Sequence, residues 1–389
     1  MTADMTALER IPVFDVRLGE EHVAAVADTL RSGWLTMGPR TQAFEAEFAE
    51  HLGVPHAVAL SSCTAALHLA YLAAGVGPGD EVIVPGITFV ATAAAVKYCG
   101  GTPVLAEVIG PDDISLDTED VARRIGPRTK AVCAVHYAGY AAPLTGLRAL
   151  CDEHGLALVE DAAHSPDAVD PGTGAPLGTV GLSGAFSFFS NKIISCGEGG
   201  LLATRDDAVA DLARSLRSHA MTSGTWDRHR GHARGYDVTG VGFNYRMDEP
   251  RAALLSARLP GLRADVEERR RLTHLYRGAL ADVAGLSLPY TPEQVDASSC
   301  YIMPVVLEDP ELRDPLRAAL DSRGIQTTVL YPSINEFSAY EGSSGAGTLP
   351  RCESIARSQL TLPLYPHLGE ERLERVVLAV REGLDEVRA

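Results

Sequence analysis

Short apolar runs alternate with helical segments over the first 160 residues, and this alternation constrains the fold more than any other feature of the chain. The runs are four or five residues long and lack the period of an amphipathic helix, so each predicts a buried strand. Helical patterns at 20–32, 41–51 and 61–73 separate or precede them. The expected strands are residues 57–60, 81–84, 103–107, 131–135 and 156–160. Repeated strand–helix alternation predicts an α/β fold with a mainly parallel, doubly wound central sheet flanked by helices.

The pattern changes after residue 178, where Gly, Ser and Phe become frequent. Two strand-like runs, 184–189 and 200–204, flank a turn that carries Lys192. A helix is expected at 206–218. The Gly-, Arg- and His-rich stretch 222–242 is typical of a long functional loop or lid.

The last third of the chain predicts a second, smaller unit. A helix from Glu249 leads to a charged helix, 263–280, which we expect to bridge two domains. Asp314 as a cap, with Pro315 in the first turn, predicts a helix at 314–323. The remaining expectations are strands at 301–307 and 325–330 and a flexible loop, without P-loop context, at 342–347.

At 389 residues the chain exceeds one ordinary hydrophobic core. We therefore expect a large domain at 1–255 and a small α+β domain at 256–389.

The chain carries a formal charge of −17, from 34 Lys and Arg against 51 Asp and Glu. This excess repels nucleic acid and anionic membrane, so an anionic ligand must be held by focused donors. The N-terminus lacks the apolar core of a signal peptide, and no apolar run approaches a membrane span of roughly 18 residues. The seven cysteines show no zinc spacing. We expect a cytoplasmic protein without a metal site.

Asp161 directly follows the run 156–160, where a parallel strand would deliver its side chain to the ligand-binding edge of the sheet. A carboxylate there could ligate a metal, act as a base, or hold a protonated pyridine nitrogen. A helix cap or a loop acid is the structural alternative.

Lys192 lies in an apolar, glycine-rich segment, followed by Gly197-Glu198-Gly199-Gly200. Lysine is almost never buried without a partner or a function. Desolvation lowers the pKa of a lysine, and the neutral amine attacks carbonyl groups. A surface lysine in a turn is the alternative.

Ser62, Cys63, Thr64 and Ala65 place hydroxyl groups and free backbone N–H groups at the start of a helix. That arrangement suits a phosphate, although Ser and Thr also cap helices without binding anything. The three segments are weak signals alone and strong in combination.

These segments belong to a longer series of motifs through which the chain resembles the DegT/DnrJ/EryC1/StrS family of sugar aminotransferases, within the fold-type I pyridoxal-phosphate enzymes. The match covers essentially the whole chain. The motifs are GWLTMGP, SCTAALHLA, GDEVIVPGITFVATAAAV, VEDAAH, FSFFSNK, GEGG, GFNYRMDEPRAAL and LPLYP.

The resemblance implies pyridoxal 5'-phosphate as the cofactor, with Lys192 as the Schiff-base lysine and Asp161 as the partner of the pyridine nitrogen. It implies that Phe89 stacks on the cofactor ring and that His164, where many relatives carry Gln, lies beside the phenolic oxygen. Thr64, Ala65 and Ser187 match the phosphate cradle. Asn244 matches an asparagine that reaches the cofactor phosphate of the neighbouring subunit, so a homodimer with shared active sites is implied.

The resemblance further implies amino transfer from glutamate to a nucleotide-linked keto-deoxysugar in aminosugar biosynthesis of a natural product, such as an antibiotic, or a surface glycan. Sugar dehydratases of the family have histidine at the position of Lys192, so the lysine favours transamination. C-3 aminotransferases often read GDGG after the lysine and C-4 enzymes often EGG, so Glu198 favours the C-4 branch and dTDP-4-keto-6-deoxyglucose.

Two departures bear on this interpretation. Asn191 stands where many relatives have Thr before the lysine. The stretch 331–335 lacks a histidine that many relatives carry near the corresponding Tyr-Pro, which weakens inference about sugar contacts there.

Other functions stay open at this point. The acceptor could be the C-3 ketosugar or a keto-cyclitol. A nucleotide-sugar oxidoreductase would need GxGxxG between a strand and a helix, which the sequence lacks in that context. A sensor would need a DNA-binding module, for which the acidic charge is wrong.

Overall fold

The computed structural model describes residues 9–223, 226, 231, 235–340 and 349–389. Its centre is a seven-stranded sheet in the order β1-β9-β8-β7-β6-β2-β3, in which only β9 runs against the other strands. The predicted α/β class with a mostly parallel sheet is therefore confirmed. The strands are β1 (His56–Leu60), β2 (Glu81–Pro85), β3 (Thr102–Ala106), β6 (Thr129–Val135), β7 (Ala157–Asp161), β8 (Ser183–Ser187) and β9 (Gly200–Thr204).

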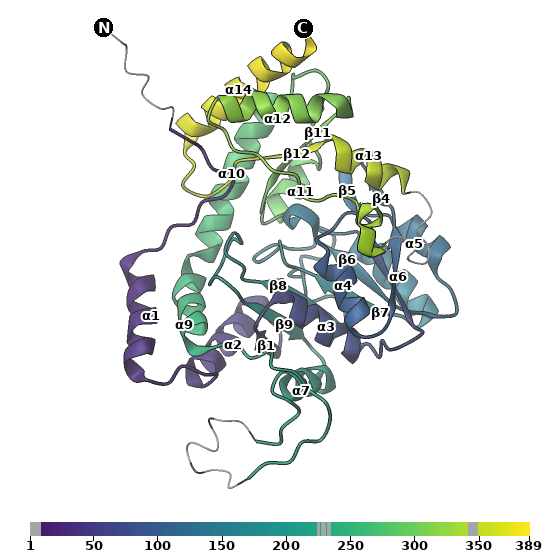
Figure 1. The fold of residues 1–389 in the computed structure, drawn as a ribbon, viewed down its shortest axis with the longest axis vertical. Helices are drawn as coiled ribbons and strands as arrows, with labels where there is room; N and C mark the ends of the chain where they lie inside the picture. The colour runs from purple at the N-terminus through teal and green to yellow at the C-terminus, as the bar shows by residue number, and fades with distance from the viewer. Residues whose placement is uncertain (1–8, 224–225, 227–230, 232–234, 341–348) are drawn as a thin grey trace.

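Helices cover both faces of this sheet (Figure 1). Alternate residues of one strand serve the two faces: Ala131 and Cys133 of β6 join the core that contains α3, whereas Val132 and Ala134 join the core beneath α6. A strand buried on both faces must be apolar throughout, which is why the strand signals in the sequence are runs and not alternations. The helices of this part are α1 (Glu20–Ser32), α2 (Pro39–Leu52), α3 (Cys63–Ala73), α4 (Ala91–Tyr98), α5 (Thr118–Arg124), α6 (Leu144–His154), α7 (Asp207–Leu216) and α9 (Glu249–Arg258).

The C-terminal part contains an antiparallel three-stranded sheet, β10-β11-β12, covered by helices (Figure 1). The N-terminal segment returns to it, because Ile11 pairs with Ile325. This arrangement is the α+β unit that the sequence predicts, whereas the domain boundary at residue 255 stays a prediction. Its elements are α10 (Leu262–Leu280), β10 (Leu286–Ser287), α11 (Pro292–Ala297), β11 (Met303–Leu307), α12 (Arg313–Ser322), α13 (Pro350–Ser358), β12 (Gln359–Leu362) and α14 (Glu370–Arg388); a small hairpin, β4 (Val108–Gly110) and β5 (Asp113–Leu116), belongs to neither sheet.

Two local predictions are wrong. Asp314 does not cap α12, because the chain turns helical one turn earlier, where Asp309 accepts a hydrogen bond from the Glu311 amide and Pro310 opens a 3-10 turn. Residues 325–330 do not form a strand and make only isolated bridges, Ile325 with Ile11 and Thr328 with Thr361. The partner of β11 is instead β12.

Two predicted loops fall partly or wholly outside the described residues. The loop at 342–347 lies outside them, as do residues 224–225, 227–230 and 232–234 of the stretch 222–242. The ends of that stretch come together, since the amide of Thr222 donates to the carbonyl of Asp237 at 3.0 Å. In the part of the chain that the structure describes, no helix is long and apolar enough to cross a membrane.

Gly200 allows β9 to pass close to the start of α3. A Cβ at this position would lie 2.2 Å from the carbonyl carbon of Ser62 and 2.3 Å from the amide nitrogen of Cys63. Both are backbone atoms, which cannot rotate away as the end of a flexible side chain can. Glycine is therefore required here for the sheet and the helix to meet.

Gly200→Ala should lower the free energy of unfolding by about 1–3 kcal/mol, the usual range for overpacking a core. Gly278→Ala is the matched control: it lies in α10 with no atom near its would-be Cβ, and should be neutral or slightly stabilising. Urea denaturation of both variants measures the difference. Equal stability of the two variants would contradict the close approach.

Candidate active site

A cavity of about 370 Å³ lies at the carboxyl edge of the central sheet. Val135, Asp161 and Ser187, the last residues of β6, β7 and β8, all line it. Parallel strands end at the same edge, so the topology brings together side chains that are far apart in the sequence. The cavity is therefore where the sheet concentrates functional groups.

Lys192 reaches this cavity from the turn between β8 and β9. Its Nζ lies 4.3 Å from the centroid of the Tyr301 ring. Removal from bulk water lowers the pKa of Lys192 to about 8, against the opposing influence of Cys63 and Asp161. A substantial fraction of the amine is then neutral near physiological pH, as a carbonyl nucleophile requires.

Arg258 holds the turn that follows the lysine. Its guanidinium donates to the Ser195 carbonyl at 2.8 Å, to Ser195 Oγ at 2.6 Å and to the Ile193 carbonyl at 3.1 Å. The position of the amine is thus fixed from α9 as well as from the sheet.

Asp161 is buried in the same cavity, and both of its oxygens accept hydrogen bonds. Oδ2 accepts from Thr92 Oγ1 at 2.7 Å and Oδ1 from the Ala163 amide at 3.2 Å. Thr88 Oγ1 lies 2.9 Å from Thr92 Oγ1. Because Thr92 donates to the carboxylate, Thr88 donates to Thr92 in turn.

Burial raises the pKa of Asp161, while the Thr92 and Ala163 hydrogen bonds and the charge of Lys192 act to lower it. A cationic ring nitrogen placed against Asp161 would favour the ionised carboxylate further. The site therefore holds a buried carboxylate, Asp161, that a positively charged partner would stabilise.

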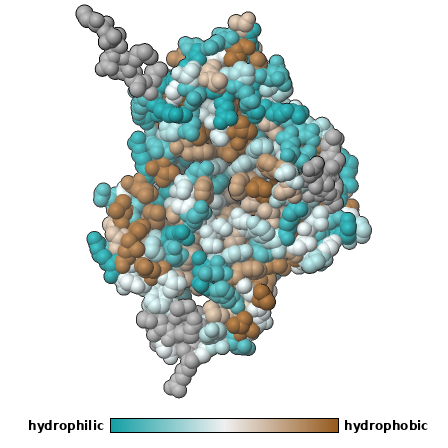
Figure 2. All heavy atoms as spheres, in the orientation of Figure 1, coloured by the Kyte–Doolittle hydropathy of each residue, from teal (hydrophilic) through white to brown (hydrophobic). Residues whose placement is uncertain are grey.

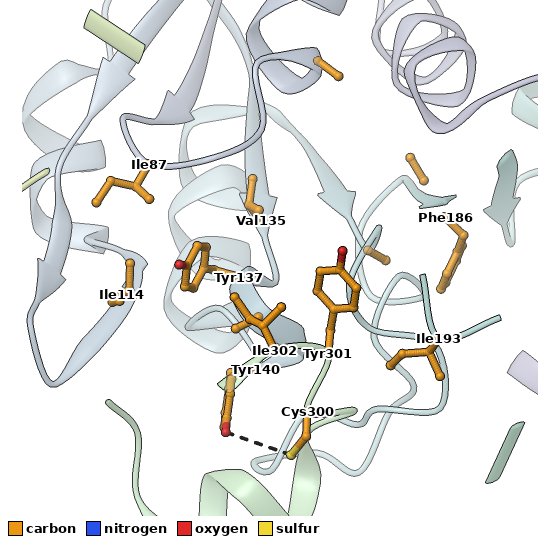
Figure 3. Close-up of a cluster of buried hydrophobic side chains, with 14 of the residues drawn as sticks. Ile87, Ile114, Val135, Tyr137, Tyr140, Phe186, Ile193, Cys300, Tyr301 and Ile302 are labelled. Carbon is orange, nitrogen blue, oxygen red and sulfur yellow. Dashed lines mark hydrogen bonds between the residues drawn. The ribbon is translucent and has the colours of Figure 1, made fainter. Parts of the chain in front are cut away.

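His164 stacks on Tyr301, with ring centroids 4.3 Å apart and planes 26° from parallel. Its Nδ1 accepts from the Ala138 amide at 3.2 Å, and its Nε2 lies 3.0 Å from Tyr331 Oη. Burial, followed by the nearby Lys192, lowers the pKa of His164 well below its usual value. Figure 3 shows Tyr301 among buried side chains that include Val135 and Ile193.

The start of α3 forms another wall. Ser62 caps the helix by accepting from the Ala65 amide at 3.1 Å, while Cys63 and Thr64 line the cavity. First-turn amides have no carbonyl partner within a helix. Thr64 and Ser187 thus face the same space, whereas Ala65 is buried behind the cavity wall with its amide occupied by Ser62.

The other two predicted residues lie further out. Phe89 lines the cavity with 54% of its surface exposed and its ring centroid 5.7 Å from that of Tyr331. Asn244 is exposed, bridges to Ser218 and does not line the cavity. Its reach into a neighbouring subunit stays a prediction.

Several lining or supporting residues were missed by sequence reasoning. Thr88 and Thr92 lie four residues apart in the sequence, a spacing that could have marked a shared face. Tyr331 precedes the proline of the Tyr-Pro pair that the resemblance had singled out. Tyr301 carries no local signal, because it comes from the C-terminal part and reaches the cavity only through the tertiary fold.

Comparison with protein families decides the class of this site. Residues 16–381 match the model of the DegT/DnrJ/EryC1/StrS aminotransferase family. The chain belongs to this family. It is an aminotransferase, and enzymes of the family depend on pyridoxal phosphate.

Individual family members align over nearly their full length. The chain is 38% identical to dTDP-3-amino-3,4,6-trideoxy-alpha-D-glucose transaminase of Streptomyces venezuelae, over 97% of each chain. It is 34% identical to spore coat polysaccharide biosynthesis protein SpsC of Bacillus subtilis, over 94% of this chain and 95% of that one. The crystal structure of the aminotransferase TlmJ from Streptoalloteichus hindustanus superposes with a TM-score of 0.89 at 38% identity, covering 97% of this chain and all of the other.

The residues of the cavity fit the cofactor of this aminotransferase family. A buried carboxylate is available for the pyridine nitrogen, an amine for the aldehyde, and helix amides with hydroxyl groups for the phosphate. Asn191 Oδ1 is buried without a hydrogen-bond partner among the described residues, so the cavity wall contains an unsatisfied hydrogen-bond acceptor.

Lys192 can be compared with the other two lysines of the chain, Lys97 and Lys130, which are exposed. In the cofactor-free protein, competitive acetylation followed by peptide mass spectrometry should show Lys192 reacting with a midpoint near pH 8. At pH 7.5 roughly a quarter of the Lys192 amines would then be neutral, against about a thousandth for an ordinary lysine. A Lys192 midpoint at or above those of Lys97 and Lys130 would contradict its desolvation.

Proposed function

We propose that this aminotransferase moves an amino group from glutamate to a nucleotide-linked keto-deoxysugar. The observation that carries the proposal is the pairing of the Lys192 amine and the Asp161 carboxylate in one buried cavity. The Streptomyces relative, a transaminase named for a dTDP-linked sugar, supports the substrate class.

We assign Lys192 as the covalent anchor of the cofactor and Asp161 as the partner of its ring nitrogen. Pyridoxal phosphate supplies an aldehyde that exchanges amino groups and a ring that withdraws electrons from a carbanion. Phe89 covers the ring, Thr64, Ala65 and Ser187 contribute to the phosphate cradle, and His164 serves the phenolic side. The Ala65 amide already donates to Ser62 Oγ. Ala65 therefore shapes the cradle and does not donate a hydrogen bond to the phosphate.

Lys192 also carries the proton. With pyridoxal phosphate and glutamate held in the cavity, its Nζ would take the proton from the glutamate α-carbon. When the ketosugar enters, Nζ delivers a proton to the sugar carbon that receives the nitrogen. A pKa near 8 suits both directions, since the group must accept and release a proton at similar cost.

We further propose a homodimer. Asp161, Glu198 and Lys192 are the charged lining residues that the structure describes, yet glutamate and a nucleotide sugar are both anions. Additional positive charge must therefore come from outside this wall, and a second copy that also brings Asn244 is the simplest source. Figure 2 shows apolar side chains gathered over α1, where Val23 and Leu30 are more than half exposed, as an interface would require.

The position of amination has two candidates. Glu198 favours C-4 amination of dTDP-4-keto-6-deoxyglucose, in line with the family pattern. The Streptomyces relative, named as a transaminase of a 3-amino sugar, favours the C-3 ketosugar as second candidate. We place the enzyme in the cytoplasm, in aminosugar synthesis for an antibiotic or for a surface glycan, for which the Bacillus spore coat relative offers a parallel.

The deciding experiment is single-turnover reaction of the amino-loaded enzyme with a panel of acceptors, with NMR of each product. The panel contains C-4 and C-3 dTDP-ketosugars and a keto-cyclitol. We expect a dTDP-ketosugar to react at least tenfold faster than the cyclitol, with nitrogen at C-4. Nitrogen at C-3 would transfer the assignment to the second candidate, and turnover of the cyclitol alone would overturn the proposed substrate class.

A further inference from the structure

The hydrogen bonds around His164 fix which of its nitrogens carries the proton. The Ala138 amide donates to Nδ1 at 3.2 Å, and a backbone amide can only donate. Nδ1 is therefore unprotonated, and the neutral ring must carry its proton on Nε2. Burial keeps the ring neutral by lowering the pKa of His164.

The fixed tautomer orients the neighbouring tyrosine. Nε2 lies 3.0 Å from Tyr331 Oη, so the histidine donates and the tyrosine accepts. The hydroxyl proton of Tyr331 is then available to a different acceptor. Tyr331 lines the cavity, and in the part of the chain described here its hydroxyl makes no other hydrogen bond.

Side chains of the C-terminal part hold the backbone that carries each of the two rings. Gln359 Nε2 donates to the Tyr331 carbonyl at 2.8 Å, and Ser299 Oγ donates to the His164 carbonyl at 2.5 Å. The His164 and Tyr331 rings lie 17° from parallel. An exchange of donor and acceptor roles between the two side chains would cost His164 the hydrogen bond from the Ala138 amide.

We propose that Tyr331 donates a hydrogen bond to an oxyanion bound in the cavity and that His164 is a positioning residue that acts through it. The acceptor is either the phenolic oxygen of the cofactor or an oxygen of the substrate. The assignment deepens the proposed function and rests on it: His164 influences the bound oxyanion through its hydrogen bond to Tyr331.

The same logic predicts which replacements His164 tolerates. Gln offers one acceptor and one donor at its tip, so it can accept from the Ala138 amide and donate to Tyr331. Leu can do neither and leaves the buried Ala138 amide unpaired. His164→Gln is therefore the conservative variant and His164→Leu the disruptive one.

The first test uses the cofactor-free protein. In ¹⁵N-labelled protein, long-range ¹H–¹⁵N NMR should show His164 as the neutral Nε2–H tautomer from pH 5.5 to 8. An Nδ1–H tautomer, or a ring that becomes protonated across this range, would overturn the proposal whatever the enzyme's activity.

The second test compares Tyr331→Phe, His164→Leu, His164→Gln and the Tyr331→Phe/His164→Leu double variant, each loaded with pyridoxal phosphate. If the cofactor accepts the hydrogen bond, Tyr331→Phe should raise the pKa of the cofactor's visible absorbance change by about one unit, because the oxygen loses a donor and holds charge less stably. If the substrate accepts it, the spectrum should stay unchanged and the KM for one substrate should rise about tenfold. No change in either quantity would overturn the role of Tyr331.

His164→Leu should reproduce the Tyr331→Phe effect, the double variant should add nothing, and His164→Gln should stay within about twofold of wild type. Multiplying effects in the double variant would show that His164 acts directly and would overturn the proposal. If the wild-type enzyme aminates none of the sugars, the proposed function fails. The His164 tautomer and the shift of the cofactor's absorbance change still test the role of Tyr331 in that case.

Discussion

The removal of one lysine amine and one carboxylate from bulk water is the constraint on which the rest of the site depends. Burying either charge alone is costly, and the pKa values of Lys192 and Asp161 both shift toward the neutral form for that reason. Each group lowers the cost of the other, and a cationic ring nitrogen would further stabilise the ionised form of Asp161. The cavity is therefore built for a ligand that is positive at one end and electrophilic at the other.

The sheet supplies this arrangement through its topology. β7 and β8 are parallel neighbours, so Asp161 and Ser187 emerge at one edge, and the turn after β8 carries Lys192 to the same place. β9 then runs back and passes the start of α3 so closely that only Gly200 fits. The start of α3, the Asp161 carboxylate and the Lys192 amine are thereby set in one rigid frame.

Much of this frame could be predicted from the sequence, because the information is local. A fully buried strand must be an apolar run, and the strand that ends in Asp161 and the turn that holds Lys192 follow from that. Contacts between distant segments could not be predicted in the same way. Tyr301 and Tyr331 come from the C-terminal part, and the role of Thr92 depends on Asp161, 69 residues away. The start of α12 was misplaced for a similar reason. Asp309-Pro310 and Asp314-Pro315 carry the same local signal, and the folded chain uses the first.

The central claim is that Lys192 is the covalent anchor of the cofactor. Borohydride reduction of the holoenzyme, followed by peptide mass spectrometry, tests it directly, because the chain offers only Lys97 and Lys130 as alternatives. We predict a phosphopyridoxyl group on Lys192 alone, and its disappearance when glutamate is added before reduction. A label on Lys97 or Lys130, or a Lys192 label that glutamate leaves unchanged, would contradict the account.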